Sequence, residues 1–172
     1  MCAFGENMVG FTRLFTFLIL CLLLWASPAN AGRFLTVIIT DVTDGDSLRA
    51  GKLRLRLFGI DAPEIQQKCQ DATSKTYACG VRAKIRMQEL VPIGATLICE
   101  HLDTDRYKRL IVACKTSKGD IAEQLVADGL ALAYRHYSER YVPAEMAAKQ
   151  AQIGLWAGRF VAPWTYRQQN RN

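Results

Sequence analysis

The residues whose types and spacing could do chemistry lie in one short stretch, Leu53–Glu64, which reads LRLRLFGIDAPE. Leucine and arginine alternate up to Leu57, the period-two pattern of a half-buried strand, with Arg56 on the face opposite the leucines. A glycine and a proline then end the strand, so we expect Asp61 and Glu64 on a turn just beyond it. An arginine and two carboxylates at one strand end suit a site where a cation and a guanidinium hold a phosphate while the second carboxylate moves a proton.

A second acidic turn comes earlier in the chain. Thr43–Asp46 reads TDGD, a turn signal, and it follows a run of β-branched and apolar residues, Phe34–Thr40. We expect Phe34–Thr40, Ser47–Ala50 and Leu53–Leu57 to form an antiparallel meander of three strands. The two acidic turns of such a meander reach the same end of the sheet, which adds Asp46 to the cluster. Taken alone, aspartates in a turn and arginines on a strand face are more often structural than functional.

The rest of the chain predicts two more strands and three helices. Apolar periodicity, prolines and glycines place their ends. The expected elements are the helix Val81–Leu90, the strands Ala95–Glu100 and Leu110–Cys114, and the helices Ile121–Asp128 and Ala144–Gln152. Five strands with one helix between the third and fourth match the order of an OB barrel. The predicted fold class is therefore α+β, mainly β: a five-stranded OB-fold barrel with about three helices.

Residues 1–31 have the pattern of a secretory signal peptide. The apolar run Leu14–Ala26 follows an arginine, and Ala29–Ala31 reads ANA, the small-x-small pattern after which signal peptidase cuts. The run is shorter than the ~20 residues of a membrane-spanning helix. Cys21 follows a leucine where a lipoprotein signal has a small residue. We therefore predict cleavage after Ala31 and export to the periplasm or the medium, with no membrane or lipid anchor.

The mature chain, residues 32–172, is expected to form a single domain with a short C-terminal extension after about residue 157. The whole chain has a formal net charge of +6, and the predicted signal peptide removes one arginine and one glutamate, so the charge is unchanged. A basic chain favours polyanionic partners. No stable protein partner is implied, and a monomer is expected.

Four cysteines remain after the signal peptide: Cys69, Cys79, Cys99 and Cys114. An even number in an oxidising compartment indicates disulfides. Zinc is the alternative, but no pair has the two-residue spacing of a zinc knuckle. Cys99 and Cys114 lie on the two arms of one predicted hairpin, whose midpoint falls within the charged turn. Directly opposed residues of an antiparallel pair are close enough to bond, so we predict Cys99–Cys114 and, for the remaining two, Cys69–Cys79.

Taken together, these residues resemble the staphylococcal nuclease, or thermonuclease, family. The motifs that carry the resemblance are Asp44–Asp46 (DGD), Arg56, Gly59–Glu64 (GIDAPE), Tyr107–Arg109 (YKR) and Gly154–Trp156 (GLW). They occur in the family's order across nearly the whole mature chain. The resemblance implies a secreted, calcium-dependent phosphodiesterase, an endonuclease that hydrolyses DNA and RNA by 5′ P–O cleavage and leaves 3′-phosphate ends.

The resemblance also implies a metal site and a general base. Asp46 and Asp61 would be carboxylate ligands of Ca²⁺, and the backbone carbonyl of Ala62 would be a third protein ligand. Calcium accepts hard oxygen donors, loose geometry and water. Glu64 would take a proton from the attacking water. Ala62 replaces the threonine of the prototype, which is harmless if only the carbonyl binds metal.

By the same resemblance, Arg56 and Arg109 would hold the scissile phosphate, a task for which a planar fork of donors suits better than a lysine. Arg106 and Tyr107 would contact the next phosphate. Lys108 replaces the glycine of the usual Tyr-Gly-Arg. If that glycine has a positive φ, the hairpin of this chain must differ locally, and with it the aim of Arg109.

A nucleotide base would stack on Tyr134 or on Tyr137, and the resemblance leaves open which. Both tyrosines are as suited to packing as to stacking. A non-catalytic OB module that binds single-stranded nucleic acid through basic and aromatic residues is the alternative function. Degenerate binding copies of this fold usually lose the carboxylates, whereas this chain keeps them together with the arginines, which favours the enzyme.

Overall fold

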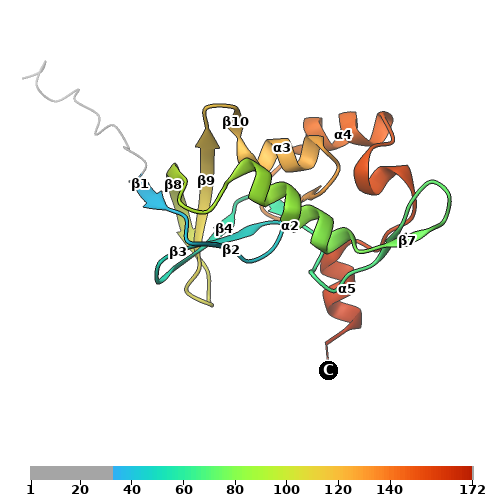
Figure 1. The fold of residues 1–172 in the computed structure, drawn as a ribbon, viewed down its shortest axis with the longest axis horizontal. Helices are drawn as coiled ribbons and strands as arrows, with labels where there is room; N and C mark the ends of the chain where they lie inside the picture. Colours follow the sequence, from blue (N-terminus) through green and yellow to red (C-terminus); the bar gives the residue numbers. More distant parts are fainter. Residues whose placement is uncertain (1–32, 172) are drawn as a thin grey trace, which may run out of the picture. The chain divides into compact units, whose positions relative to one another are not determined.

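The computed structural model describes residues 33–171 of the 172-residue chain, so the predicted signal peptide lies outside the described residues. Figure 1 shows a mixed fold of strands and helices, which confirms the predicted α+β class. Within the described part, no helix is both long and apolar enough to cross a membrane.

One sheet forms the centre of the fold. The strands in chain order are β1 (Arg33–Ile38), β2 (Asp41–Val42), β3 (Ser47–Ala50), β4 (Leu53–Leu57), β5 (Ile60–Asp61), β6 (Cys69–Gln70), β7 (Thr76–Tyr77), β8 (Thr96–Thr104), β9 (Leu110–Thr116), β10 (Gly119–Asp120) and β11 (Leu132–Ala133). The main sheet has the order β1-β8-β9-β4-β3-β2, with β10 added to β9. Only β4 and β9 run parallel within it. Among the described residues the sheet follows this open path and does not close into a barrel.

The helices are α2 (Cys79–Leu90), α3 (Ile121–Ala127), α4 (Val142–Gln150) and α5 (Pro163–Gln169), with a 3₁₀ turn, η2 (Gly154–Ala157). The first three lie within about two residues of the expected helices. Asp120 caps α3, because its side chain accepts hydrogen bonds from the backbone N–H groups of Ala122 and Glu123. Gly129 follows this helix with φ of 64°, the left-handed conformation that favours glycine. Helix α5 was not expected.

The first predicted strand, Phe34–Thr40, is interrupted, and this expectation was wrong in detail. Its first part, β1, pairs with β8, whereas its continuation, β2, pairs with β3. The change of partner occurs at two residues: the N–H of Ile39 donates to Ala95 O at 2.9 Å, and the N–H of Thr40 donates to Arg49 O at 2.8 Å. Only β2, β3 and β4 therefore form the expected antiparallel meander.

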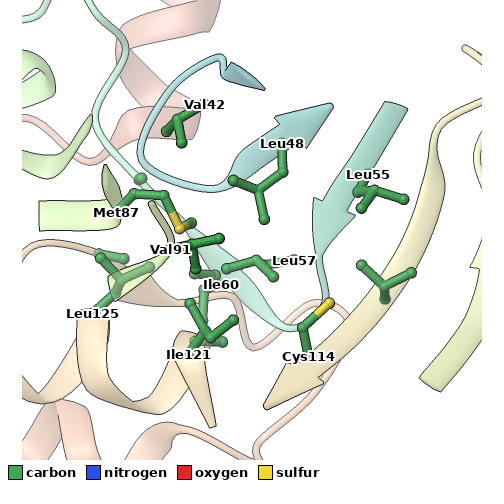
Figure 2. Close-up of a cluster of buried hydrophobic side chains, with 14 of the residues drawn as sticks. Val42, Leu48, Leu55, Leu57, Ile60, Met87, Val91, Cys114, Ile121 and Leu125 are labelled. Carbon is green, nitrogen blue, oxygen red and sulfur yellow. The ribbon is translucent and has the colours of Figure 1, made fainter. Parts of the chain in front are cut away.

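The core lies between the main sheet and the helices α2 and α3 (Figure 2). Leu55 and Leu57 of β4 are 1% and 2% exposed, whereas Leu53 is 44% exposed. Leu53 pairs with Ala50 of β3, but the pairing of β4 with β9 begins at Leu55, so the first leucine of the alternating pattern is left partly exposed at the end of the strand. The side chains that meet these leucines are Val42, Leu48, Met87, Val91, Ile121 and Leu125.

Both predicted disulfides are present. Cys99 and Cys114 lie opposite each other in the β8–β9 register, with Cα atoms 4.1 Å apart. Cys69 and Cys79 are bonded with Cα atoms 5.6 Å apart. The segment between Cys69 and Cys79 contains the short hairpin β6–β7, and the buried disulfide packs with Leu132 and Leu155 in a second, smaller apolar cluster.

Replacing Cys69 and Cys79 together by alanine is expected to lower the free energy of unfolding by about 2–3 kcal/mol, because the bond closes a loop in the unfolded chain. Urea denaturation of the oxidised protein measures this loss. For comparison, the Cys99→Ala/Cys114→Ala double variant should lose a similar amount of stability, since the two disulfides close loops of similar length, with sequence separations of 10 and 15. Unchanged unfolding of the first variant would contradict the expectation.

Candidate active site

The two acidic turns meet, and Gly45 allows it. A Cβ atom at this position would lie 2.7 Å from the Cβ atoms of both Ala62 and Ala83, so only glycine lets the first turn approach the second turn and α2 this closely. The N–H of Ala62 donates to Oδ2 of Asp46 at 2.8 Å. Asp46 is 2% exposed and Asp61 is fully buried. The predicted proximity of the two turns is therefore a packing constraint of the fold.

Arg56 joins the two aspartates. One nitrogen of its guanidinium donates to Asp46 Oδ1, and the other donates to Asp61 Oδ1 at 2.7 Å. The hydroxyl of Ser47, which is paired with Arg56 across β3 and β4, also donates to Asp46 Oδ1, at 3.0 Å. Burial disfavours the charge of the guanidinium, but the charges of Asp46 and Asp61 outweigh burial and raise the pKa of Arg56. The fork is thus a permanent cation that orients both carboxylates.

A third aspartate adds negative charge to this cluster. Oδ1 of Asp44 accepts a hydrogen bond from the N–H of Asp46 at 3.0 Å. Burial, and then the neighbouring charge of Asp46, raise the pKa of Asp44 to about 7. Burial also raises the pKa of Asp61, in spite of its arginine partners. Carboxylates that resist ionisation in this way gain from a nearby divalent cation.

The donor set suits a hard cation, because Asp46 and Asp61 offer carboxylate oxygens and Ala62 offers its backbone next to them. Within residues 33–171, no three Asp, Glu, His or Cys side chains are placed to hold a metal ion. A cation held by the two aspartates would therefore take further oxygen ligands from the backbone and from water. Such a cation would supply positive charge to attract a phosphate and to offset negative charge that builds up in the reaction.

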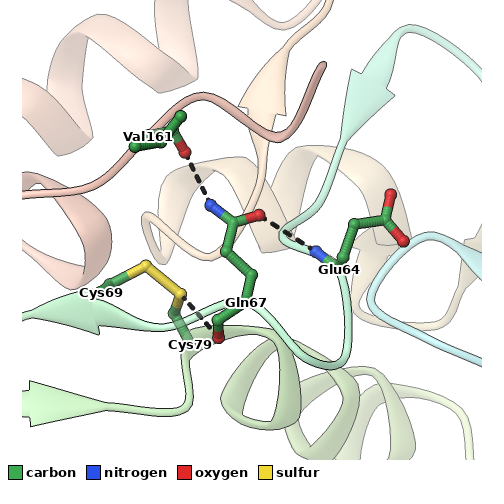
Figure 3. Close-up of a disulfide and its surroundings, with 5 residues drawn as sticks. All are labelled: Glu64, Gln67, Cys69, Cys79 and Val161. Atoms are coloured by element: carbon green, nitrogen blue, oxygen red, sulfur yellow. Dashed lines mark hydrogen bonds between the residues drawn. A yellow bond between two sulfur atoms is a disulfide. The ribbon is translucent and has the colours of Figure 1, made fainter. Parts of the chain in front are cut away.

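Glu64 lies on the following loop, which is held in place from two sides. Gly80, at the start of α2, packs against the backbone of Glu64. A Cβ atom on residue 80 would lie 1.8 Å from the carbonyl oxygen of Glu64. Gln67 is fully buried, and its Oε1 accepts a hydrogen bond from the N–H of Glu64 at 3.3 Å while its Nε2 donates to Val161 O at 2.7 Å (Figure 3). The side chain of Glu64 remains 38% exposed. A fixed backbone with an accessible carboxylate suits a proton acceptor.

Replacing Gly80 by alanine is expected to cost about 1–3 kcal/mol of stability, because the added methyl group forces the Glu64 loop away from α2. Cleavage activity is expected to fall with it, since Glu64 moves. Thermal unfolding and a nuclease assay measure the two effects. Gln88→Ala, on the exposed face of the same helix, is the control and should change stability by no more than about 0.5 kcal/mol. Wild-type stability and activity of the Gly80→Ala variant would show that the Glu64 loop moves away from α2 without cost.

The charged hairpin between β8 and β9 is organised by Asp105. Its carboxylate accepts hydrogen bonds from the backbone of Tyr107 and Arg109, and its Oδ2 accepts one from Nε of Arg109 at 2.7 Å. Lys108 has φ of 59°, the left-handed conformation usual for glycine. Lysine thus adopts this left-handed conformation here, at a cost of about 1–2 kcal/mol. The guanidinium groups of Arg106 and Arg109 both lie over the ring of Tyr107, 5.0 and 5.6 Å from its centroid.

Tyr134 follows β11, which pairs with β5 and so carries the tyrosine to the turn that holds Asp61. Its N–H donates to Gly59 O at 2.8 Å. The ring of Tyr137 meets that of Tyr134 edge-on at 5.1 Å and is the more exposed of the two. The ring of Trp164, from α5, stacks on Tyr134 at 5.4 Å with an interplanar angle of 8°. The free aromatic face at this end is therefore that of Tyr137.

These residues surround one groove of about 1280 Å³. Seven of the predicted site residues line it: Arg56, Glu64, Arg106, Tyr107, Arg109, Tyr134 and Tyr137. The three predicted metal-binding residues are buried behind Arg56. The structure thus brings the predicted set to one place, with Arg109 held by Asp105 at the hairpin and Arg56 held by the aspartates.

Two residues of α5 that also line the groove, Trp164 and Arg167, were not predicted from the sequence. The guanidinium of Arg167 donates to both oxygens of Asp61 and to Oε1 of Glu64. Burial lowers the pKa of Arg167, but its hydrogen bonds with Asp61 and Glu64 and their charges outweigh burial, so the pKa is raised. Pro163 at the first turn of α5 is the one helix signal in this segment, and it does not indicate where the helix packs.

Comparison with known families gives a match over residues 54–158, more than half of the chain, with the family described as staphylococcal nuclease homologues. The chain belongs to this family. The matched region runs from β4 to the end of η2 and contains the Asp61 turn, the charged hairpin and β11. The OB fold of staphylococcal nuclease homologues thus accounts for the strand order, and α5 lies beyond the region that matches.

Relatives of this family member include bacterial and plant proteins. Succinoglycan biosynthesis protein ExoI of Rhizobium meliloti (strain 1021) is 29% identical over 117 residues, 67% of this chain and 61% of that protein. An uncharacterized endonuclease of Haemophilus influenzae is 29% identical over 144 residues, 79% of this chain and 75% of that protein. Probable staphylococcal-like nuclease CAN1 of Oryza sativa subsp. japonica is 34% identical over 131 residues, 74% of this chain and 36% of that protein. This chain therefore spans less than two thirds of the first and third of these relatives.

Proposed function

We propose that this staphylococcal nuclease homologue is a secreted, calcium-dependent endonuclease that hydrolyses the phosphodiester bonds of DNA and RNA. The observation that carries the proposal is the fork of Arg56, which holds Asp46 and Asp61 together beside the exposed carboxylate of Glu64. Family membership and relatives named as nucleases support the reaction class.

The residues divide the chemistry among them. Arg56 and Arg109 bind the scissile phosphate and offset the charge that builds on its oxygens. Glu64 takes a proton from a water molecule as its oxygen attacks phosphorus. The bond from phosphorus to the 5′ oxygen breaks, so one product ends in a 3′-phosphate, and the 5′ oxygen takes a proton from solvent. Tyr107 and Arg106 line the groove where the adjoining phosphate lies, and Tyr137 offers a face for a base.

Export is part of the proposal. Its support is the charge, apolar run and ANA motif of residues 1–31, together with two disulfides in the folded domain, which persist in oxidising compartments. The mass of the protein recovered from the periplasm or the medium tests the cleavage site: an N-terminus at Gly32 is expected. Retention of residues 1–31 in the recovered protein would contradict it.

The test of the reaction is cleavage of single-stranded DNA and RNA by the purified mature chain. With calcium chloride, both substrates should be cut and the new ends should carry 3′-phosphates. With a chelator in excess, cleavage should stop and should return when calcium is restored. Binding of the oligonucleotides without cleavage under any of these conditions would favour the non-catalytic nucleic-acid-binding module instead.

A further inference from the structure

The C-terminal segment is docked against the active site through several contacts. Arg159 exchanges two backbone hydrogen bonds with Gln70, next to the Cys69–Cys79 disulfide. Val161 accepts the hydrogen bond from the buried amide of Gln67 (Figure 3). Trp164 packs against the cluster around that disulfide and stacks on Tyr134. The segment therefore has a defined position, and α5, drawn in red in Figure 1, forms one wall of the groove.

This position brings Arg167 onto the buried carboxylate at the centre of the site. One of its terminal nitrogens is 3.0 Å from Asp61 Oδ1 and 2.8 Å from Glu64 Oε1, and the other is 2.8 Å from Asp61 Oδ2. Arg56 already donates to Asp61 Oδ1. Both oxygens of this fully buried carboxylate thus accept hydrogen bonds from a guanidinium, and among the described residues Oδ2 accepts one only from Arg167.

We propose that Arg167 competes with the divalent cation for Asp61, so that the docking of α5 sets the affinity of the site for that cation. The proposal rests on the proposed function in one respect, since it takes Asp61 as a cation ligand. A cation bound at Oδ2 of Asp61 and the guanidinium of Arg167 would repel each other at the same oxygen. Cation binding therefore weakens or breaks the hydrogen bonds of Arg167, and the free energy lost with them is subtracted from the affinity.

The opposite role for Arg167 would be to support the site. A guanidinium that holds Asp61 and Glu64 in position for the cation would strengthen cation binding, as outer contacts do around metal ligands. The two roles predict opposite signs for the same variant. Competition predicts tighter cation binding when Arg167 is removed, and support predicts weaker binding.

Isothermal titration of the mature protein with calcium chloride, without nucleic acid, separates them. For Arg167→Gln we expect a dissociation constant at least about tenfold lower than that of the wild type, because a positive charge within hydrogen-bond distance of the ligand is lost. Arg167→Lys keeps the charge on the helix and should stay closer to the wild type. Arg171→Gln is the matched control, since Arg171 lines the same groove and pairs with no carboxylate in the described part of the chain; its change should be within about twofold.

A second variant tests the docking of the helix. Trp164→Ala removes the stack on Tyr134 but keeps Arg167 in the chain. Because α5 then docks less firmly and Arg167 competes less, this variant should also tighten calcium binding, by a smaller factor. Thermal unfolding gives a readout independent of both titration and catalysis: in chelator Arg167→Gln should melt below the wild type, and saturating calcium should reduce or reverse that difference. Unchanged or weaker calcium binding by Arg167→Gln would overturn the competition. If calcium bound neither the wild type nor any variant, both the competition by Arg167 and the calcium requirement would be overturned. If the wild type cleaved nucleic acid with calcium but Arg167→Gln bound calcium with wild-type affinity, only the competition would be overturned.

Discussion

Replacing Glu64 by glutamine is expected to lower kcat by about 10²- to 10⁴-fold, the usual contribution of a general base. Glutamine has nearly the same shape but cannot accept the proton of the attacking water. The backbone of residue 64 stays where Gln67 and Gly80 hold it, so the fold and the groove should be unchanged. Nucleotide affinity should remain near that of the wild type, because the substitution leaves in place the arginines and the cation that are proposed to bind the phosphate.

Single-turnover cleavage and the equilibrium binding of a non-cleavable oligonucleotide measure these two quantities separately. Glu139→Gln is the control, since Glu139 is an exposed glutamate outside the groove. Its kcat should equal that of the wild type. Full turnover by the Glu64 variant would remove this residue from the role of base, and a loss confined to affinity would make it a binding residue.

Replacing Arg56 by lysine is expected to lower kcat by about 10²- to 10³-fold, comparable to the loss of one donor that stabilises the transition state. A lysine carries a point charge and cannot bridge Asp46 and Asp61 while also presenting a planar pair of donors to a phosphate. One buried carboxylate is then left with fewer partners, so the free energy of unfolding should fall as well.

Arg54→Lys is the matched control for this variant. Arg54 lies two residues earlier on the same face of β4, is exposed, and donates to a backbone carbonyl of Tyr107 rather than to the aspartates. Its substitution should leave kcat near the wild-type value. The ratio of kcat and KM effects decides the role of Arg56: a rise in KM with unchanged kcat would mean that this arginine attracts the substrate without assisting the reaction.

The centre of the site could be predicted because its parts are local in sequence. The period-two pattern placed Arg56 on one face of β4, and turn-forming residues placed Asp46 and Asp61 at strand ends, so a meander was enough to bring them together. The opposition of Cys99 and Cys114 followed from the symmetry of one hairpin in the same way. In each case a repeating pattern or a turn fixes the geometry within a few residues.

The contacts that could not be predicted depend on partners far away in the chain. Arg167 and Asp61 are 106 positions apart. They come together because the C-terminal segment docks on Gln67 and on the disulfide hairpin, and no repeating sequence pattern indicates these contacts. The division of the first strand into β1 and β2 depends on which neighbour each half finds. Lys108 kept a conformation expected of glycine because the hydrogen bonds of Asp105 outweigh the local strain.

The two disulfides each join a cysteine to the next cysteine along the chain, Cys69 to Cys79 and Cys99 to Cys114. A chain that emerges from a translocation channel from its N-terminus exposes both members of the first pair before either member of the second. An oxidant that acts in that order produces the native pairing directly. Under the proposed export, the native pairing would therefore form without a disulfide isomerase, unlike that of a protein whose bonds connect non-consecutive cysteines.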